Sequence, residues 1–249
     1  MHDFMSGGIS VRNGGQSLPE IIGKYLGGGM HKFTLVVIPI LMILVGAVFI
    51  VTPSQILSDK TDMPYLMWVA IIIVYYFVAT ILPVDKIIGK IYPVFGAALI
   101  FMAVALFGVL IFGDYPIPEL TTFENKHLNA DNLPIVPTLF ISIACGAISG
   151  FHATQSPLMA RCMTNERQAR PIFFGAMISE SVIALVWAAI AMAFFGGVEG
   201  LNTFMQENGS NAGVAVSVIT DTTLGIVGSV LAILGVVIAP ITSGDTAFR

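Results

Sequence analysis

Charged residues are scarce in this sequence. Only 10% of its 249 residues are Asp, Glu, Lys or Arg, against about a quarter in soluble domains. By contrast, 56% are hydrophobic and the mean hydropathy is +0.88. This balance excludes a soluble globular domain and requires lipid as the solvent. The 11 basic residues are scattered and the net charge is −4, so no nucleic-acid partner is predicted.

Cysteine and histidine are also rare, and their spacing excludes further classes. The two cysteines, Cys145 and Cys162, make neither a disulfide framework nor a metal quartet. The four histidines are far apart and form no H-E-x-x-H pair, and no G-x-S-x-G elbow accompanies His152. We therefore expect no enzyme, no cofactor and no resident metal. The first 15 residues lack the apolar stretch of a signal peptide, so internal spans must direct membrane insertion.

Long apolar runs are what the sequence does contain. A transmembrane helix takes about 20 residues, and we expect an all-α, polytopic transmembrane helix bundle of about six spans. The runs cover residues 33–52, 64–83, 93–112, 134–151, 171–195 and 223–242. Residues 212–220 are also apolar, so the sixth span is either one interrupted element or two. Before the first run, Ser17 and Glu20 form a capping box that opens a short interfacial helix, which glycines 27–29 close.

The basic residues alternate between the two sides of these spans. Nine of the 11 fall in segments that share one side, and Lys60 and Lys126 fall on the other. Short loops rich in Lys and Arg stay in the cytoplasm. Both termini are therefore predicted to be cytoplasmic, and residues 1–32 to form a cytoplasmic N-terminal segment.

Glu180 is the sharpest functional signal, because an ionisable group at membrane depth is costly and commonly faces a cavity or the protein interior. It lies nine residues after Pro171, about 14 Å along a helix, near the middle of a core about 30 Å thick. Four alanines lie on or near its face at helical spacing: Ala176, Ala184, Ala188 and Ala191. Small residues let another helix approach closely, so we expect Glu180 to point into the bundle as a proton or cation site. The alternative is a neutral, hydrogen-bonded carboxyl that serves packing.

A polar stretch over residues 146–157 combines glycines, hydrogen-bonding side chains and a terminal proline. It predicts a broken helix, which membranes tolerate only where the backbone is buried in protein or lines a cavity and which builds many transporter sites. The substrate-binding candidates are Ser149, Gly150, His152, Thr154 and Gln155. The alternatives are an ordinary loop or close helix packing through G-x-x-x-G.

Residues 240–246, Pro-Ile-Thr-Ser-Gly-Asp-Thr, form a second interrupted helix end. Hydroxyls, freed carbonyls and a carboxylate are hard ligands of the kind that hold Na⁺ at broken helices. Ser243, Asp245 and Thr246 are therefore candidates for ion coupling, and the alternative is a plain helix exit. Upstream, four small residues predict tight contact with a neighbouring helix: Gly228, Ala232, Gly235 and Ala239. Asp221 is expected to be solvated near the outer boundary.

Three strings resemble the carbon starvation protein A (CstA) family. They are HDFMSGGISVRNGGQSLPEIIGKYLG (2–27), GAISGFHATQSPLMARCMTNERQARPIFFGAMISESVIALVWAAIAMAFFGG (146–197) and APITSGDTAFR (239–249). The resemblance implies a bacterial inner-membrane transporter linked to starvation and peptide uptake, with some relatives that take up pyruvate with protons. It also implies that residues 33–249 are part of a longer transmembrane domain, since family members are longer at both ends. The implied partners are a peptide or pyruvate, H⁺ or Na⁺, and the remainder of the transporter.

Two hypotheses follow for the function. In the first, the chain is a segment of a secondary transporter: substrate binds against the broken fourth helix, Glu180 takes up a proton or helps to hold a cation, and residues 243–246 complete the coupling site. In the second, the chain is a non-transporting membrane sensor or interaction subunit, and the same polar groups only fix helix packing. Substitution of Glu180 separates them, because only the first predicts a loss of uptake.

Overall fold

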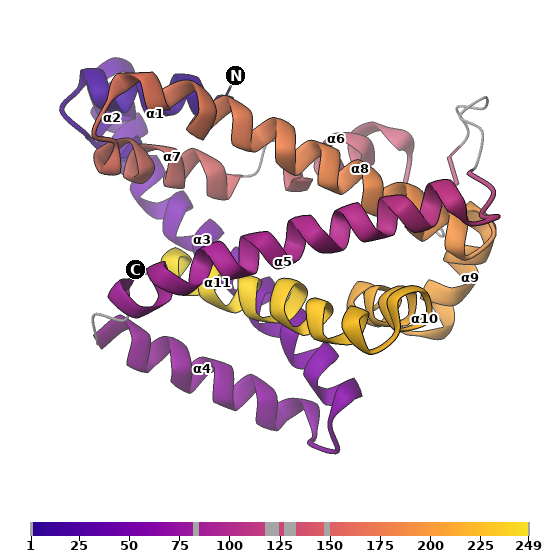
Figure 1. Ribbon diagram of the computed structural model, residues 1–249. Coiled ribbons are helices and arrows are strands. Elements are labelled where there is room, and N and C mark those ends of the chain that lie inside the picture. The colour runs from indigo at the N-terminus through magenta and orange to yellow at the C-terminus, as the bar shows by residue number, and fades with distance from the viewer. Residues whose placement is uncertain (1, 82–84, 118–124, 127–132, 147–149, 249) are drawn as a thin grey trace. The chain divides into compact units, whose positions relative to one another are not determined.

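The computed structural model describes residues 2–81, 85–117, 125–126, 133–146 and 150–248, and every regular element in them is helical (Figure 1). The α-helices are α1 (His2–Arg12), α2 (Leu18–Leu26), α3 (Gly28–Lys60), α4 (Tyr65–Ile81), α5 (Asp85–Phe112), α6 (Ile135–Gly146), α7 (Gly150–Cys162), α8 (Ala176–Phe194), α9 (Val198–Glu207), α10 (Ala212–Ala232) and α11 (Ala239–Phe248). A short 3-10 turn, η1 (Glu166–Gln168), and two π-helical stretches, η2 (Arg170–Gly175) and η3 (Ile233–Ile238), join some of them. The predicted all-α fold is confirmed.

Four helical stretches among the described residues are long and apolar enough to cross a membrane. They are Gly28–Lys60, Pro93–Phe112, Glu166–Phe194 and Ala212–Gly244, and they contain the first, third, fifth and sixth predicted runs. The second run forms α4, whose 17 residues reach about 25 Å. The fourth run is divided between α6 and α7. The structure therefore shows a helical membrane bundle, whereas the predicted count of about six spans is not confirmed.

The short helix α2 has the predicted capping box. The Ser17 backbone N–H donates to Oε2 of Glu20 at 2.7 Å, and the Ser17 hydroxyl donates to the same oxygen at 2.9 Å. The backbone hydrogen bond is the main cause that lowers the pKa of the Glu20 carboxyl. Gly27, with φ at 91°, ends the helix, and α3 begins at once at Gly28. The first span helix therefore starts five residues before the apolar run predicts.

Proline and glycine distort the two C-terminal span helices without ending them. Pro171 lies inside η2, and Pro240 follows η3 by two residues. Proline has no N–H for the carbonyl four residues back, so the helical ladder is interrupted near both. In α10 the interruption falls at Gly225, whose φ of 58° and ψ of −141° bend the helix. The sixth span is thus two helical segments joined by a kink at Gly225, just after the predicted interruption at residues 221–223.

The chain divides into two units, and α3 and α8 each contribute residues to both. The first unit comprises Met1–Leu44 and Asp131–Val182. Within it, α1 packs along α7 and also contacts η2 and α2 (Figure 1). The N-terminal helix is therefore an integral layer of this unit.

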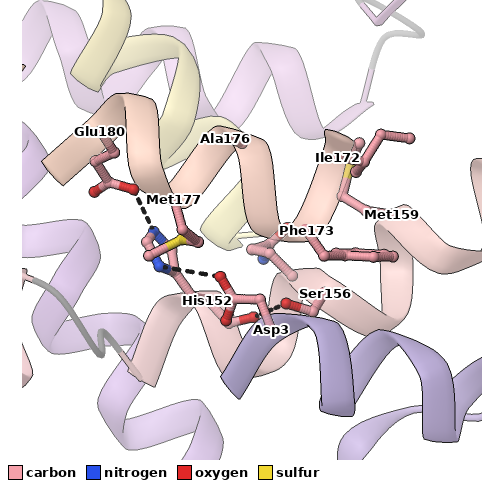
Figure 2. A pocket seen from close by; sticks show the side chains of 10 residues that line it. Asp3, His152, Ser156, Met159, Ile172, Phe173, Ala176, Met177 and Glu180 are labelled. Carbon is pink, nitrogen blue, oxygen red and sulfur yellow. Dashed lines mark hydrogen bonds and ion pairs between the residues drawn. The ribbon is translucent and has the colours of Figure 1, made fainter. Parts of the chain in front are cut away.

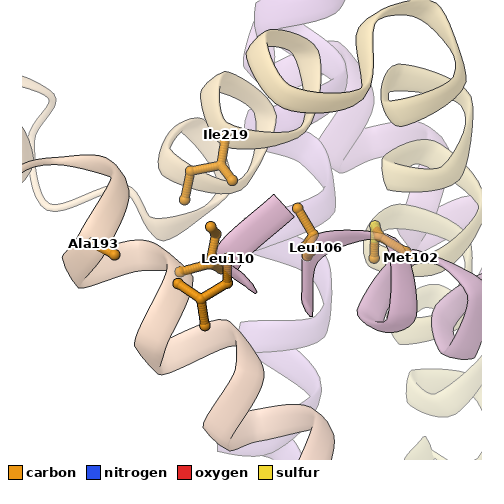
Figure 3. Close-up of a cluster of buried hydrophobic side chains, with 6 residues drawn as sticks. Met102, Leu106, Leu110, Ala193 and Ile219 are labelled. Carbon is orange, nitrogen blue, oxygen red and sulfur yellow. The ribbon is translucent and has the colours of Figure 1, made fainter. Parts of the chain in front are cut away.

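The second unit comprises Val45–Ala130 and Ile183–Arg249 and holds the apolar core. Its central cluster consists of Met102, Leu106, Leu110, Ile190, Ala193 and Ile219, drawn from α5, α8 and α10 (Figure 3). The predicted small face packs tightly: a Cβ atom added at Gly235 would lie 2.7 Å from Cδ2 of Leu99 on α5. The predicted close contact of this face with a neighbouring helix is confirmed at Gly235.

Candidate substrate and coupling site

A cavity of about 410 Å³ lies within the first unit, where α1, α7, η2 and α8 meet. Its lining combines ionisable, polar and apolar side chains, shown in Figure 2: Asp3, His152, Gln155, Ser156, Met159, Ile172, Phe173, Ala176, Met177 and Glu180. A cavity of a few hundred Å³ with a few convergent polar groups has the size and character of a small-molecule site.

The imidazole of His152 lies between two carboxylates. Its Nε2 atom is 3.8 Å from Oε2 of Glu180, and its Nδ1 atom is 3.6 Å from Oδ2 of Asp3 (Figure 2). The side chain of Asp3 is 9% exposed, whereas that of Glu180 is 50% exposed. One carboxylate is thus fixed inside the unit, and the other borders open space at the rim of the cavity.

Helical spacing on α7 brings its polar groups to the cavity. His152, Gln155, Ser156 and Met159 lie at positions i, i+3, i+4 and i+7, which place them on one helix face. The Ser156 hydroxyl donates to the His152 carbonyl at 2.8 Å, so it is satisfied within the helix. Pro157 lies inside α7 and does not end it.

From Gly150 to Pro157 the predicted broken helix is not found, because this part of the stretch is helical. The polar residues from Gly150 onward lie on helical backbone, so their side chains and not freed carbonyls line the cavity. Residues 147–149, where a break between α6 and α7 would fall, lie outside the described residues, and Ser149 is among them. Thr154 donates to the sulfur of Met42 at 3.6 Å and does not line the cavity.

The predicted coupling residues divide between the two units. Glu180 lies in the first unit and faces His152, which is a substrate-binding candidate. Ser243 lies on α11 in the second unit, and the side chains of Asp245 and Thr246 lie outside the described part of the chain. The backbone there is helical through Phe248, so the prediction of freed carbonyls at residues 240–246 is wrong. The interruption falls in η3 instead, just before Pro240.

Two acidic residues take positions that the sequence did not indicate. Asp3 reaches the cavity from α1 across a large separation in the chain. The only signal for it is the spacing of the buried residues Asp3, Gly7 and Ser10, which share a helix face. Asp221, expected to be simply solvated, is ion-paired within the second unit: Nζ of Lys60 lies 2.9 Å from its Oδ2.

The small-residue face predicted around Glu180 is divided in the structure. Ala176 lines the cavity with Glu180. Ala188 and Ala191 line a separate apolar cavity of about 370 Å³ in the second unit. Only the first turns of α8 therefore line the cavity that contains His152.

The ionisable groups of the cavity are acidic and imidazole side chains. The cavity lining contains two carboxylates and one imidazole, with no Lys or Arg among the residues described there. Asp3 and Glu180 face opposite nitrogens of His152, so the three do not converge on one point. Across the described ranges, no three metal-binding side chains come together.

Four long apolar helical stretches among the described residues define a polytopic α-helical membrane protein. Comparison with known families makes the assignment more specific. The family model described as carbon starvation protein CstA matches residues 50–235. This chain therefore belongs to the carbon starvation protein CstA family.

Several characterised or catalogued proteins are similar to this chain. An uncharacterized membrane protein of Haemophilus influenzae is 38% identical over 248 residues, covering 78% of this chain and 66% of that protein. A peptide transporter CstA of Helicobacter pylori is 34% identical over 119 residues, or 45% of this chain and 17% of that protein. The pyruvate/proton symporter BtsT of Escherichia coli is 34% identical over 115 residues, which cover 45% of this chain and 16% of that protein. The chain thus spans only part of each relative's length. No solved structure matches it.

Proposed function

We propose that this chain forms part of a secondary transporter for small nutrients, with peptides and pyruvate as candidate substrates and H⁺ or Na⁺ as the coupling ion. The names of its relatives, peptide transporter and pyruvate/proton symporter, support this class. The observation that carries the proposal is the cavity in which His152 of α7 lies 3.8 Å from Glu180 of α8. The proposed role of Glu180 is to take up the coupling proton.

The charges of the lining explain why a coupling ion would be needed. With both carboxylates ionised, the cavity is negative whether the imidazole of His152 is neutral or protonated. Charges a few ångströms apart interact strongly away from bulk water. A proton taken up by Glu180 would remove one negative charge and so favour entry of a carboxylate-bearing substrate. Gln155 would supply hydrogen bonds to the substrate, and Met159 and Phe173 its apolar contacts.

The cellular setting is part of the same proposal. The uneven distribution of basic residues supports an inner-membrane protein with both termini in the cytoplasm. The family name supports a role in carbon starvation. A second ion site at Ser243, Asp245 and Thr246 also stays a proposal, and on the helical backbone of α11 its ligands would be side chains.

Uptake by the intact protein in proteoliposomes tests the role of Glu180. A labelled dipeptide and labelled pyruvate would be offered with and without an inward proton gradient. Wild type is expected to accumulate at least one probe when the gradient is present. Glu180→Gln keeps the shape of the side chain but cannot ionise, so gradient-driven accumulation is expected to fall to the level of protein-free liposomes.

Glu199→Gln is the matched control, because Glu199 is an exposed carboxylate in the first turn of α9, outside the cavity. It should retain wild-type uptake. Coupled uptake that persists in Glu180→Gln would rule out the proposed carboxylate role. Absence of gradient-driven uptake of either probe by wild type would favour the sensor or interaction subunit.

A further inference from the structure

Asp3 stands out among the buried polar side chains of the described residues. The others are all serine or threonine: Ser10, Thr34, Ser54, Ser156, Ser217, Thr220 and Thr242. Hydroxyls of this kind can be satisfied by a carbonyl of their own helix, as Ser54 is by Ile50 at 2.7 Å. A buried carboxylate carries a much larger desolvation cost and cannot donate to a carbonyl when ionised. In the first turn of α1, this carboxylate faces the imidazole of His152 across the cavity.

The contacts of α1 fix Asp3 in that position. At Gly7, one turn along the same face, an added Cβ would lie 2.6 Å from the Phe173 ring, so only glycine allows this close approach. Beyond the end of α1, the Gly15 carbonyl accepts a hydrogen bond from the Arg161 side chain. The helix therefore runs alongside α7 in the same direction, with Asp3 level with His152.

We propose that Asp3 is a positioning residue of this site, which holds a proton on Nδ1 of His152 and so directs Nε2 towards Glu180. This inference rests on the proposed function. A hydrogen bond or a charge at one ring nitrogen of a histidine influences which nitrogen carries the proton. At 3.6 Å, Oδ2 of Asp3 lies at ion-pair distance from Nδ1 and beyond hydrogen-bond distance, so in this geometry Asp3 acts through its negative charge.

With Nδ1 protonated, Nε2 has a lone pair that can accept the proton of a neutral Glu180. In this step the O–H bond of Glu180 breaks and an N–H bond forms at Nε2, which leaves a glutamate carboxylate and an imidazolium. The negative charge of the Asp3 carboxylate stabilises the imidazolium. The proton returns to Glu180 by the reverse step, so the pair forms a two-position relay that Asp3 keeps oriented.

The position of Asp3 and Glu180 on either side of His152 also bears on two sequence predictions that cannot both be correct. Glu180 was predicted at the membrane midplane, and residues 1–32 were predicted to be cytoplasmic. Because Asp3 and Glu180 face the same imidazole, α1 lies at the depth of Glu180. With a cytoplasmic N-terminus, as proposed above, Glu180 would therefore lie towards the cytoplasmic side of the membrane core and not at its midplane.

Nitrogen NMR of the intact protein, labelled with ¹⁵N-histidine in nanodiscs, tests the Asp3 contact without transport. The His152 signal is identified by its loss in His152→Gln. In wild type the neutral ring is expected mainly as the Nδ1–H tautomer. In Asp3→Asn, which lacks the charge, that tautomer should fall below half of the population, and Asp3→Glu should restore it. An unchanged tautomer ratio in Asp3→Asn would overturn the proposal.

Uptake of whichever probe wild type accumulates provides the second readout. Removal of a group that orients a functional histidine costs on the order of 10-fold, so the maximal rate should fall roughly tenfold in Asp3→Asn while KM changes less than about twofold. Asp3→Glu should recover most of the rate. A rise in KM alone, or a wild-type rate in Asp3→Asn, would contradict a positioning role.

Two glycine variants separate positioning from loss of helix packing. Gly8 has no atom within 4 Å of an added Cβ, so Gly8→Ala should retain uptake, tautomer ratio and thermal stability. Gly7→Leu should force α1 away from Phe173 and lower all three. Asp3→Asn is expected to keep the thermal midpoint of Gly8→Ala, and a midpoint as low as that of Gly7→Leu would assign Asp3 to packing instead. If wild type shows no coupled uptake, the proposed function fails, while the tautomer comparison still decides the Asp3 contact.

Discussion

In each of the two units, one helix shows a different kind of burial. In the first, the buried face of α1 consists of Asp3, Gly7 and Ser10, which are small or polar. In the second, α5 buries Met102 and Leu106 with 0% exposure against aliphatic residues of other helices. In lipid, helices gain little from hydrophobicity and associate through close packing and polar contacts. The comparison therefore separates a polar helix face that borders a cavity from an apolar cluster built on dense packing.

This difference separates a region that can bind ions and small molecules from a region that is rigid. A cavity with a half-exposed carboxylate can admit ions and small molecules. A cluster of fully buried aliphatic side chains resists rearrangement, because protein interiors are close-packed. Substitutions in the apolar cluster of the second unit should therefore act on stability, and those around His152 should act on function.

The largest effect on stability is expected from a cavity in the apolar cluster. Leu106→Ala removes a fully buried side chain that packs in the cluster with Ile190 and Ile219. The loss of stability on truncating a buried leucine combines a water-to-interior transfer free energy with the loss of packing contacts. In lipid the transfer free energy is small, so we expect the free energy of unfolding to fall by about 2 kcal/mol, the lower end for such changes. Unfolding of the protein in mixed detergent micelles with increasing SDS would measure it.

Val104→Ala on the same helix is the matched control for this measurement. Val104 is 64% exposed, so its truncation removes few packing contacts and should change the free energy of unfolding by less than about 0.5 kcal/mol. Equal losses for the two variants would show that the α5 cluster is not the packed core described above.

A smaller loss of stability is expected when a methyl group is added at a tightly packed position of the second unit. Gly235→Ala places a methyl group 2.7 Å from Cδ2 of Leu99, and Leu99 must then change its rotamer. Overpacking of this kind costs about 1 kcal/mol when the clash is with the end of a side chain. The same SDS titration applies, with Gly108→Ala as the control, because no atom lies within 4 Å of an added Cβ there. If Gly235→Ala proved more stable than wild type, the close contact between η3 and α5 would be wrong.

Much of the fold could be predicted from the sequence because membrane helices depend on a property that composition reveals. A run of about 20 apolar residues satisfies its backbone only as a helix in lipid, and the runs at 33–52 and 93–112 both lie within span-length helices. Helix ends were less predictable. The start of α3 at Gly28 and the helicity of residues 150–157 both place glycine and polar residues in helices, where tertiary contacts override low propensity.

The candidate site could be predicted in part. Glu180, His152 and Gln155 were identified from their chemistry, and the structure brings them to one cavity. Asp3 could not be identified, because a short helix rich in glycine and serine gives no local sign of what it packs against. Contacts between distant segments depend on three-dimensional packing, which one sequence does not reveal.

The smallest effect is expected at the edge of the first unit, where acid should loosen α2 and leave the apolar unit unchanged. The hydrogen bond from the Ser17 backbone lowers the pKa of Glu20 below its ordinary value of 4.5. A lowered pKa means that the ionised carboxylate stabilises the folded helix, fully above pH 4.5 and progressively less as the pH falls through the lower folded value. The amide signal of Ser17 in NMR spectra should therefore move with a midpoint below 4.5. Glu20→Gln, which can still accept the capping hydrogen bond, should give a Ser17 signal that does not titrate in this range. A midpoint above 4.5 in wild type, or the same titration in Glu20→Gln, would mean that another group controls the start of α2.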